Sequence, residues 1–136
     1  LSRYIITHKA DYYRLLQEVR THGKWEEWIL YMLEAVEQTS NETIELINGI
    51  DTLMKNTQER VAAQLPKIYS KDLVEILFMH PYTKIDFLVE GLNLHRDTAS
   101  KYLKELEKVG VLKPLKIRRS KYFINLELFN MLKKGI

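Results

Sequence analysis

The sequence predicts a mainly α-helical protein with a short β-hairpin near its C-terminus. Apolar residues recur at three- and four-residue spacing over most of the chain, as they do along one face of a helix. No proline occurs between Trp25 and Leu65, so nothing in that stretch forces a helix to end. The segments 111–117 and 122–124 alternate apolar and polar residues instead, which predicts two strands.

Pro66 marks the boundary between two expected domains. Proline disfavours the helical conformation in the residue before it, so the preceding helix is expected to end there. We therefore expect a helical region at 1–65 and a second domain at 66–136.

Short helices are expected over 1–8 and 9–22, followed by a long one. The helix at 9–22 places four apolar residues on its inner face and ends at His22-Gly23: Tyr12, Leu15, Leu16 and Val19. From 25 to 65 a single helix would run about 60 Å at 1.5 Å per residue. The Thr-Ser-Asn segment at 39–41 leaves a second possibility, in which the helix breaks there and a new helix begins, because these side chains can cap a new helix.

The second domain is expected to contain three helices. The first begins near Ser70 and ends at His80-Pro81. The second covers 84–92, with Gly91 as its stop, because glycine accepts the left-handed backbone at helix ends. The third runs over 96–109, with Gly110 as its cap and three residues on its inner face: Ala99, Leu103 and Leu106.

The last two helices and the hairpin have the layout of a winged helix-turn-helix domain. The helix at 96–109 is the candidate recognition helix, since its basic residues point outward. The hairpin is the candidate wing, with Arg118, Arg119, Ser120 and Lys121 at its tip. This layout predicts three helices and a two-stranded wing.

Basic charge is concentrated in the second domain. Residues 1–65 carry 7 Lys and Arg against 10 Asp and Glu, whereas 66–136 carry 14 against 8, which together give the net charge of +3. An excess of positive charge on one domain favours polyanions such as DNA through counterion release, although a solvated surface can have the same composition.

We therefore expect binding to double-stranded DNA, with arginines on guanine edges or phosphates and lysines on the backbone. The candidate DNA-binding residues are Arg96, Thr98, Lys101, Lys104, Arg118, Arg119 and Lys121. His95 precedes the recognition helix and either caps it or contacts phosphate. A protein-docking or dimerisation role is the alternative. Basic residues that converge on one surface without neutralisation by Glu105 or Glu107 would favour DNA, whereas an exposed apolar patch on that surface would favour docking.

Three segments of the first region resemble Fic-family (Fic/DOC-like) proteins downstream of their active-site loop. These are Leu1-Ser-Arg-Tyr-Ile, Tyr12-Tyr-Arg-Leu-Leu-Gln-Glu-Val-Arg20, and Trp25-Glu-Glu-Trp28-Ile-Leu with Leu33-Glu34 and Val36. Many members carry a winged helix after a long helix. The resemblance implies that the chain is the C-terminal part of such a protein, and that Trp25 and Trp28 pack its helical domain.

The resemblance also implies chemistry that this chain is not expected to perform. The family transfers AMP from ATP to a hydroxyl group of a target protein, using a loop of the form His-Pro-Phe-x-Asp/Glu-Gly-Asn-Gly-Arg. Here His80-Pro81-Tyr82 is followed by Thr-Lys-Ile-Asp-Phe, without the glycines that form a phosphate nest. We expect no catalytic, cofactor-binding or metal residue in this chain, and we expect ATP, Mg²⁺ and a protein target for the full-length parent.

The composition also bears on the cellular location of the protein and on its oligomeric state. The absence of cysteine is compatible with a cytoplasmic protein, and the longest uncharged apolar run, 28–33, is shorter than the roughly 20 residues that span a bilayer. Because the chain starts with leucine inside an expected helix, we expect it to be cut from something longer. Apolar side chains would then be exposed and favour a homodimer: Tyr4, Ile5, Tyr12, Leu16, Trp25 and Trp28.

Overall fold

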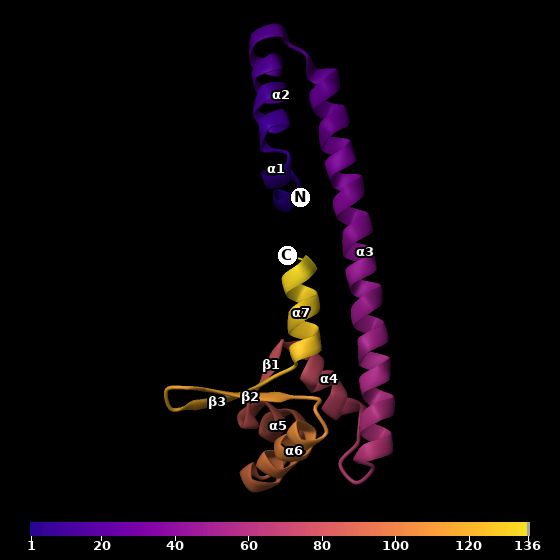
Figure 1. Cartoon of the computed structure of the whole chain (residues 1–136), viewed down its shortest axis with the longest axis vertical. Coiled ribbons are helices and arrows are strands. Elements are labelled where there is room, and N and C mark those ends of the chain that lie inside the picture. The colour runs from indigo at the N-terminus through magenta and orange to yellow at the C-terminus, as the bar shows by residue number, and fades with distance from the viewer. Residues whose placement is uncertain (136) are drawn as a thin grey trace. The chain divides into compact units, whose positions relative to one another are not determined.

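The computed structural model describes residues 1–135 and confirms a mainly α-helical fold with a small antiparallel sheet (Figure 1). The elements, in chain order, are α1 (Ser2–Thr7), α2 (Lys9–His22), α3 (Trp25–Gln64), α4 (Lys71–Met79), β1 (Tyr82–Thr83), α5 (Ile85–Leu92), α6 (Arg96–Lys108), β2 (Lys113–Ile117), β3 (Ser120–Ile124) and α7 (Leu126–Gly135).

The chain divides into two compact units, 1–47 together with Gly135, and 48–134. This division lies inside α3, upstream of the boundary expected at Pro66. The physical reason is packing: Val61 of α3 is fully buried in the core of the second unit, and Leu65 packs against the same core. The second half of α3 is therefore a structural part of the second unit.

α3 is one continuous helix of 40 residues, which settles the choice left open at 39–41. Ser40 and Asn41 are exposed and remain within the helix. One turn later, Thr43 Oγ1 donates a hydrogen bond to the Thr39 carbonyl at 2.8 Å. This hydroxyl therefore bonds back to its own helix instead of capping a new one.

Aromatic side chains form most of the core of the first unit. Tyr4 and Tyr31 are buried, with ring centroids 5.6 Å apart, and Tyr12 lies against Trp28 at 5.3 Å. Burial raises the pKa of both buried tyrosines, because the charged phenolate loses its hydration. The predicted inner face of α2 is confirmed for Leu15, which is 5% exposed.

The expected exposure of apolar residues in this unit was partly wrong. Tyr4 is buried and Trp28 is half-buried, because α1, α2 and α3 already cover them. Trp25 is 59% exposed and is not part of the core, so of the two tryptophans expected to pack the helical domain only Trp28 does so. Further exposed apolar residues of α3 include Ile29, Leu33 and Val36.

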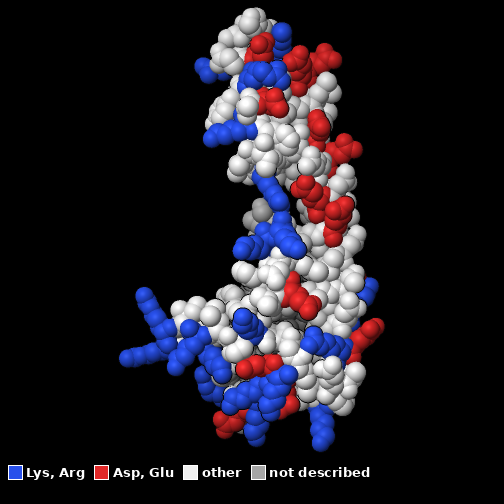
Figure 2. Space-filling model, viewed as in Figure 1, with Lys and Arg blue, Asp and Glu red and all other residues white. Residues whose placement is uncertain are grey.

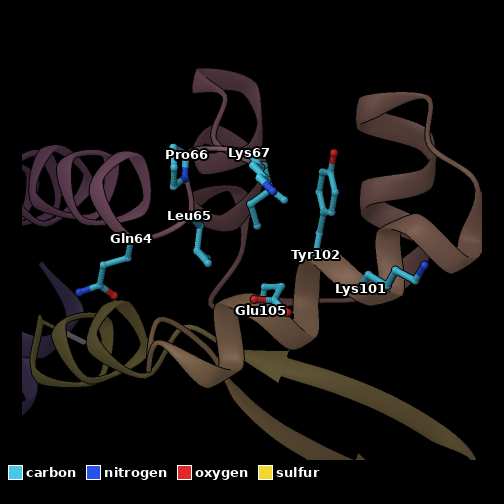
Figure 3. Close-up of a pocket in the computed structure, with 8 residues that line it drawn as sticks. Gln64, Leu65, Pro66, Lys67, Lys101, Tyr102 and Glu105 are labelled. Atoms are coloured by element: carbon cyan, nitrogen blue, oxygen red, sulfur yellow. The ribbon is translucent and has the colours of Figure 1, made fainter.

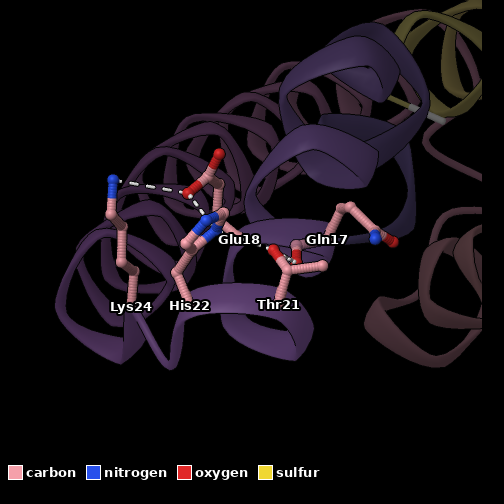
Figure 4. A network of polar contacts seen from close by, with 5 residues as sticks. All are labelled: Gln17, Glu18, Thr21, His22 and Lys24. Carbon is pink, nitrogen blue, oxygen red and sulfur yellow. Dashed lines mark hydrogen bonds and ion pairs between the residues drawn. The ribbon is translucent and has the colours of Figure 1, made fainter.

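Polar contacts stabilise the C-terminal end of α2 (Figure 4). Thr21 Oγ1 donates to the Gln17 carbonyl at 2.9 Å, and a Glu18 carboxylate oxygen lies 3.3 Å from Lys24 Nζ and 3.4 Å from His22 Nδ1. Gly23 follows in the left-handed conformation at φ 62°, so the predicted stop is confirmed.

The second unit is built around one apolar core. Leu73 and Leu77 of α4, Leu88 of α5, and Leu103 and Leu106 of α6 are almost completely buried in it. Ser70 begins α4 as predicted, because its hydroxyl accepts a hydrogen bond from the Leu73 amide at 3.0 Å. Together α4, α5 and α6 are the three helices that the sequence predicted.

Gly91 does not stop α5, contrary to the prediction. It lies inside the helix, and Asn93 takes the left-handed conformation at φ 52° instead. A Cβ atom at Gly91 would lie 2.5 Å from Cδ1 of Ile76. Glycine is therefore present because α4 and α5 approach closely there, and asparagine tolerates the left-handed backbone that ends the helix.

The C-terminus of α6 is held by a side chain from α3. Gly110 follows α6 at φ 77°, as the sequence predicted. The Arg60 guanidinium donates a hydrogen bond to the carbonyl of Val109, at the end of α6. A cation at this position satisfies a free carbonyl and is favourable with the helix dipole. This contact ties the second half of α3 to α6.

The sheet has three strands in the order β1-β3-β2, one more than the predicted wing. Tyr82 pairs with Ile124 and Thr83 with Phe123, so a two-residue strand joins the hairpin to α4 and α5. The hairpin tip is shorter than expected, because Ile117 pairs with Ser120 and leaves only Arg118 and Arg119 in the turn.

α7 was not predicted. Asn125 begins it: its side-chain oxygen accepts from the Leu128 amide, and its side-chain nitrogen donates to the Leu77 carbonyl, both at 3.3 Å. Asn125 is 5% exposed, so these bonds satisfy a buried amide. The sequence does contain a signal for this helix, namely the capping residue Asn125 followed by the apolar residues Leu128 and Leu132.

Thr83→Val is expected to stabilise the protein by about 1 kcal/mol. Thr83 is 1% exposed, and within residues 1–135 its hydroxyl has no hydrogen-bond partner, so valine removes an unsatisfied polar atom at equal size. The free energy of unfolding in urea measures the effect. Thr57→Val is the control, because the buried Thr57 hydroxyl donates to the Leu53 carbonyl at 2.8 Å. A stabilisation no larger than that of the control would contradict the prediction.

Candidate nucleic-acid interface

The side of α6 opposite its buried face carries three lysines. Lys101, Lys104 and Lys108 are exposed, and Glu105 lies 3.4 Å from Lys108. No ion pair involves Lys101 or Lys104 in the part of the chain that the structure describes. Glu105 therefore pairs with the lysine that the sequence analysis left out, and the two predicted lysines keep their charges for a ligand.

The hairpin extends from the second unit with basic side chains at its end (Figure 2). On the face shown, blue side chains predominate over the hairpin and the neighbouring helices. At the tip, Arg118 has the left-handed conformation at φ 55°. Glycine adopts this conformation without penalty, whereas other residues lose about 1–2 kcal/mol. An arginine at such a position suggests a role for its charge.

The strand register places two lysines opposite each other. Lys116 of β2 pairs with Lys121 of β3, and the next pair on the same face is Pro114 with Phe123. Phe123 is 1% exposed and faces the core, so the two lysines lie on the side of the hairpin that faces the helices. Like charges directly opposite each other are destabilising, so this pair favours a bound anion.

A cavity of about 240 Å³ lies between the hairpin tip and the starts of α5 and α6. Four cationic side chains line it together with one carboxylate: Lys84, Arg96, Arg119 and Lys121, with Asp86. Lys84 Nζ lies 4.8 Å from the centroid of the Tyr122 ring, a cation–π contact that links this lysine to β3. Three separate elements thus contribute positive charge to one concave surface.

Arg96 is already paired in this cavity. Its Nη1 lies 2.5 Å from Oδ1 of Asp86, and the two side chains are 68% and 61% exposed. Exposed ion pairs of this kind are weak, so an anion of higher charge can replace the carboxylate. The sequence pattern does not predict this pair, because only the packing of α5 against α6 brings Asp86 beside the start of α6.

The structure brings three of the seven predicted residues together, namely Arg96, Arg119 and Lys121. The others lie on the same two elements: Lys101 and Lys104 on the exposed side of α6, Thr98 half-buried, and Arg118 at the tip. His95 precedes α6 and makes no capping hydrogen bond with its side chain.

Sequence reasoning missed Lys84 and Lys116. Their contribution depends on the contact between β1 and β3 and on the hairpin register, respectively. A short strand pairing of this kind has no sequence signal strong enough to place Lys84 beside the wing.

A second cavity, of about 490 Å³, adjoins α6 on another side (Figure 3). The turn after α3 supplies Leu65, Pro66 and Ile68, and α6 supplies Tyr102, so its lining is largely apolar. Lys101 contributes its stem, and Figure 3 shows its ammonium group pointing away from Tyr102 and Leu65. This cavity suits an apolar group better than a nucleic acid.

The His80-Pro81-Tyr82 segment lies between α4 and α5. Residues 1–135 contain no group of three His, Asp or Glu side chains placed to hold a metal ion. His80 ends α4, and the chain after Pro81 forms β1 and α5 in place of a phosphate-binding loop. The His80 ring stacks on Tyr82 with centroids 5.8 Å apart, in keeping with the structural interpretation of His80-Pro81.

Residues 53–128 match the family model for the C-terminal domain of SoFic-like protein adenylyltransferases. The chain belongs to this family. The match begins within α3 and ends within α7, so the SoFic-like domain contains the hairpin and all of α4, α5 and α6. It confirms the predicted relationship to Fic proteins, although the segments that carried the resemblance lie upstream of it. No described helix of this SoFic-like protein is both long and apolar enough to span a bilayer.

Lys116→Gln is expected to stabilise the SoFic-like domain by about 0.2–1 kcal/mol and to weaken any binding of a polyanion such as DNA. The change removes repulsion from Lys121 opposite it, and also removes a charge that a polyanion would use. Urea unfolding and DNA titration measure the two effects. Lys113→Gln is the matched control, since Lys113 pairs with Ile124. Equal stabilisation by both variants would refute the proposed repulsion.

Proposed function

We propose that this chain is the DNA-binding module of a SoFic-like adenylyltransferase. The observation that carries the proposal is the cavity where Arg96 of α6 meets Arg119 and Lys121 of the hairpin, with Lys84 beside them. Four cations around one concave surface repel one another in the free protein, and a phosphate backbone neutralises them.

The exposed side of α6 would lie in the major groove, which is about 12 Å wide and admits one helix. Lys101 and Lys104 then face the DNA, while the apolar face of the helix stays in the core. Arg118 and Arg119 at the hairpin tip would contact the adjacent backbone or a groove edge. Thr98, half-buried on the flank of α6, would contact a phosphate through its hydroxyl.

AMP transfer belongs, in this proposal, to the remainder of a longer parent protein. That remainder would bind ATP and Mg²⁺ and modify a hydroxyl group on a protein target in the cytoplasm, as the Fic resemblance implies. The present chain would perform no chemistry and would instead place the enzyme on DNA or regulate it there.

DNA binding is tested by fluorescence anisotropy with a labelled random-sequence duplex at several salt concentrations. We expect binding that weakens steeply with salt, because counterions are released from each contacted phosphate. The double variant Arg118→Ala/Arg119→Ala is expected to bind more weakly, with a slope of log affinity against log salt that is smaller by about 1–2.

The double variant Lys71→Ala/Lys133→Ala removes the same charge from α4 and α7 and serves as the control. Equal losses in the two double variants would mean that net charge alone attracts DNA. Absence of binding at low salt would reject the DNA-binding proposal and favour docking.

Docking of a protein target is the second candidate function, and the 490 Å³ cavity supports it. Its volume lies within the range of about 300–1,000 Å³ that is typical of ligand pockets. An apolar side chain of a target polypeptide would enter between Leu65, Ile68 and Tyr102. DNA binding at near-physiological salt that depends on Arg118 and Arg119 would count against this candidate.

A homodimer is proposed for the first unit. Trp25, Ile29, Leu33 and Val36 recur at four- and three-residue spacing on α3 and are 50–60% exposed, which leaves one apolar helix face uncovered. Leu33→Glu is expected to shift the sedimentation coefficient from dimer to monomer, whereas Gln38→Glu, away from that face, should leave it unchanged. A monomer at high concentration in the unmodified protein would contradict the proposal.

A further inference from the structure

We propose that the 240 Å³ cavity beside the hairpin tip is a site for one phosphate group, and that Asp86 controls its affinity by holding Arg96. This inference rests on the proposed DNA-binding function only in one respect, namely that the phosphate group comes from DNA. The site itself follows from the residues that line the cavity: Lys84, Ile85, Asp86, Arg96, Arg119, Ser120 and Lys121.

The charge around the cavity suits a compact anion. Four cations from three elements face one carboxylate, which leaves an excess of three positive charges. The arginines offer planar sets of N–H donors that match phosphate oxygens, and the Ser120 hydroxyl adds another donor. A carboxylate ligand has fewer oxygens and less charge, so it would use this arrangement less completely.

The backbone at the start of α5 supports the same ligand class. Lys84 is the N-cap residue and makes no capping hydrogen bond with its side chain. An ammonium group only donates hydrogen bonds, so it leaves the first amides of the helix without a side-chain acceptor. Such amides, together with the helix dipole, favour an anion where cations have already gathered.

Asp86 opposes the phosphate in two ways. Its Oδ1 lies 2.5 Å from Nη1 of Arg96, so it neutralises one of the four cations. It is also the only acidic residue among those that line the cavity, and its charge repels an incoming phosphate. Binding therefore requires the Arg96 guanidinium to exchange the carboxylate for phosphate oxygens. This exchange makes Asp86 a residue that tunes affinity, separate from the cations that hold the ligand.

Inorganic phosphate, titrated into the ¹⁵N-labelled chain at constant ionic strength, is the direct probe. We expect shifts of the amides at 84–86, 96 and 119–121. Asp86→Asn should bind phosphate about fivefold more tightly, the factor expected from removing one like charge at about 4 Å in water. Arg119→Gln should bind it about two- to fivefold more weakly, as for loss of one exposed charge pair.

Asp97→Asn is the matched control for Asp86→Asn. Each aspartate is exposed and lies in the first turn of a helix, so each substitution removes the same charge and the same helix-end interaction. Asp97 does not line the cavity and makes no ion pair in the described part of the chain. Its replacement should change phosphate affinity less than twofold. Equal effects of the two substitutions, or shifts outside the cavity, would overturn the proposal.

The source of the phosphate is decided by two duplexes of one sequence, with and without a 5′-phosphate. Equal affinity, increased by Asp86→Asn, supports a backbone phosphodiester, whereas a preference for the phosphorylated duplex supports a terminal phosphomonoester. If neither duplex binds but phosphate shifts the cavity amides, the phosphate site stands and the DNA-binding function fails. If DNA binds while Asp86→Asn and Asp97→Asn behave alike, the site fails and the DNA-binding function stands.

Discussion

Burial of the apolar face of α6 is the interaction on which the second unit depends. Ala99, Leu103 and Leu106 are completely buried, and each leucine contributes about 1.5–3 kcal/mol by leaving water. Because this face is fixed against α4, α5 and α3, the rotation of α6 about its axis is also fixed. Its lysines are consequently exposed, and Arg96 is held beside α5 and the hairpin tip.

The same packing creates an electrostatic cost. Lys116 faces Lys121 across the hairpin, and Lys121 also lines the cavity that contains Arg96 and Arg119. Repulsion of this kind reduces stability in the free protein and is relieved when an anion binds. Asp86 offsets part of it through its ion pair with Arg96. The cavity therefore balances stability of the free domain against affinity for phosphate.

Local signals predicted much of the second unit and failed where distant segments meet. The start of α4 near Ser70 was predicted correctly, because the bond from the Leu73 amide to the Ser70 hydroxyl is made within one helical turn. Gly91 was misinterpreted as a helix stop, because the Ile76 side chain that approaches it closely comes from another helix. Likewise, the hairpin was predicted but the third strand was not, since Thr83 pairs with Phe123 far along the chain.

The sequence by itself determined the helical periodicity, the ends of most helices, the hairpin and the basic character of the second half, because these depend on neighbouring residues and on composition. Only the tertiary structure decided that α3 joins the second core through Val61, that Arg60 binds the end of α6, and that Asp86 meets Arg96 beside Arg119. These contacts require packed helices and a paired sheet, and no local pattern encodes the distance between such residues.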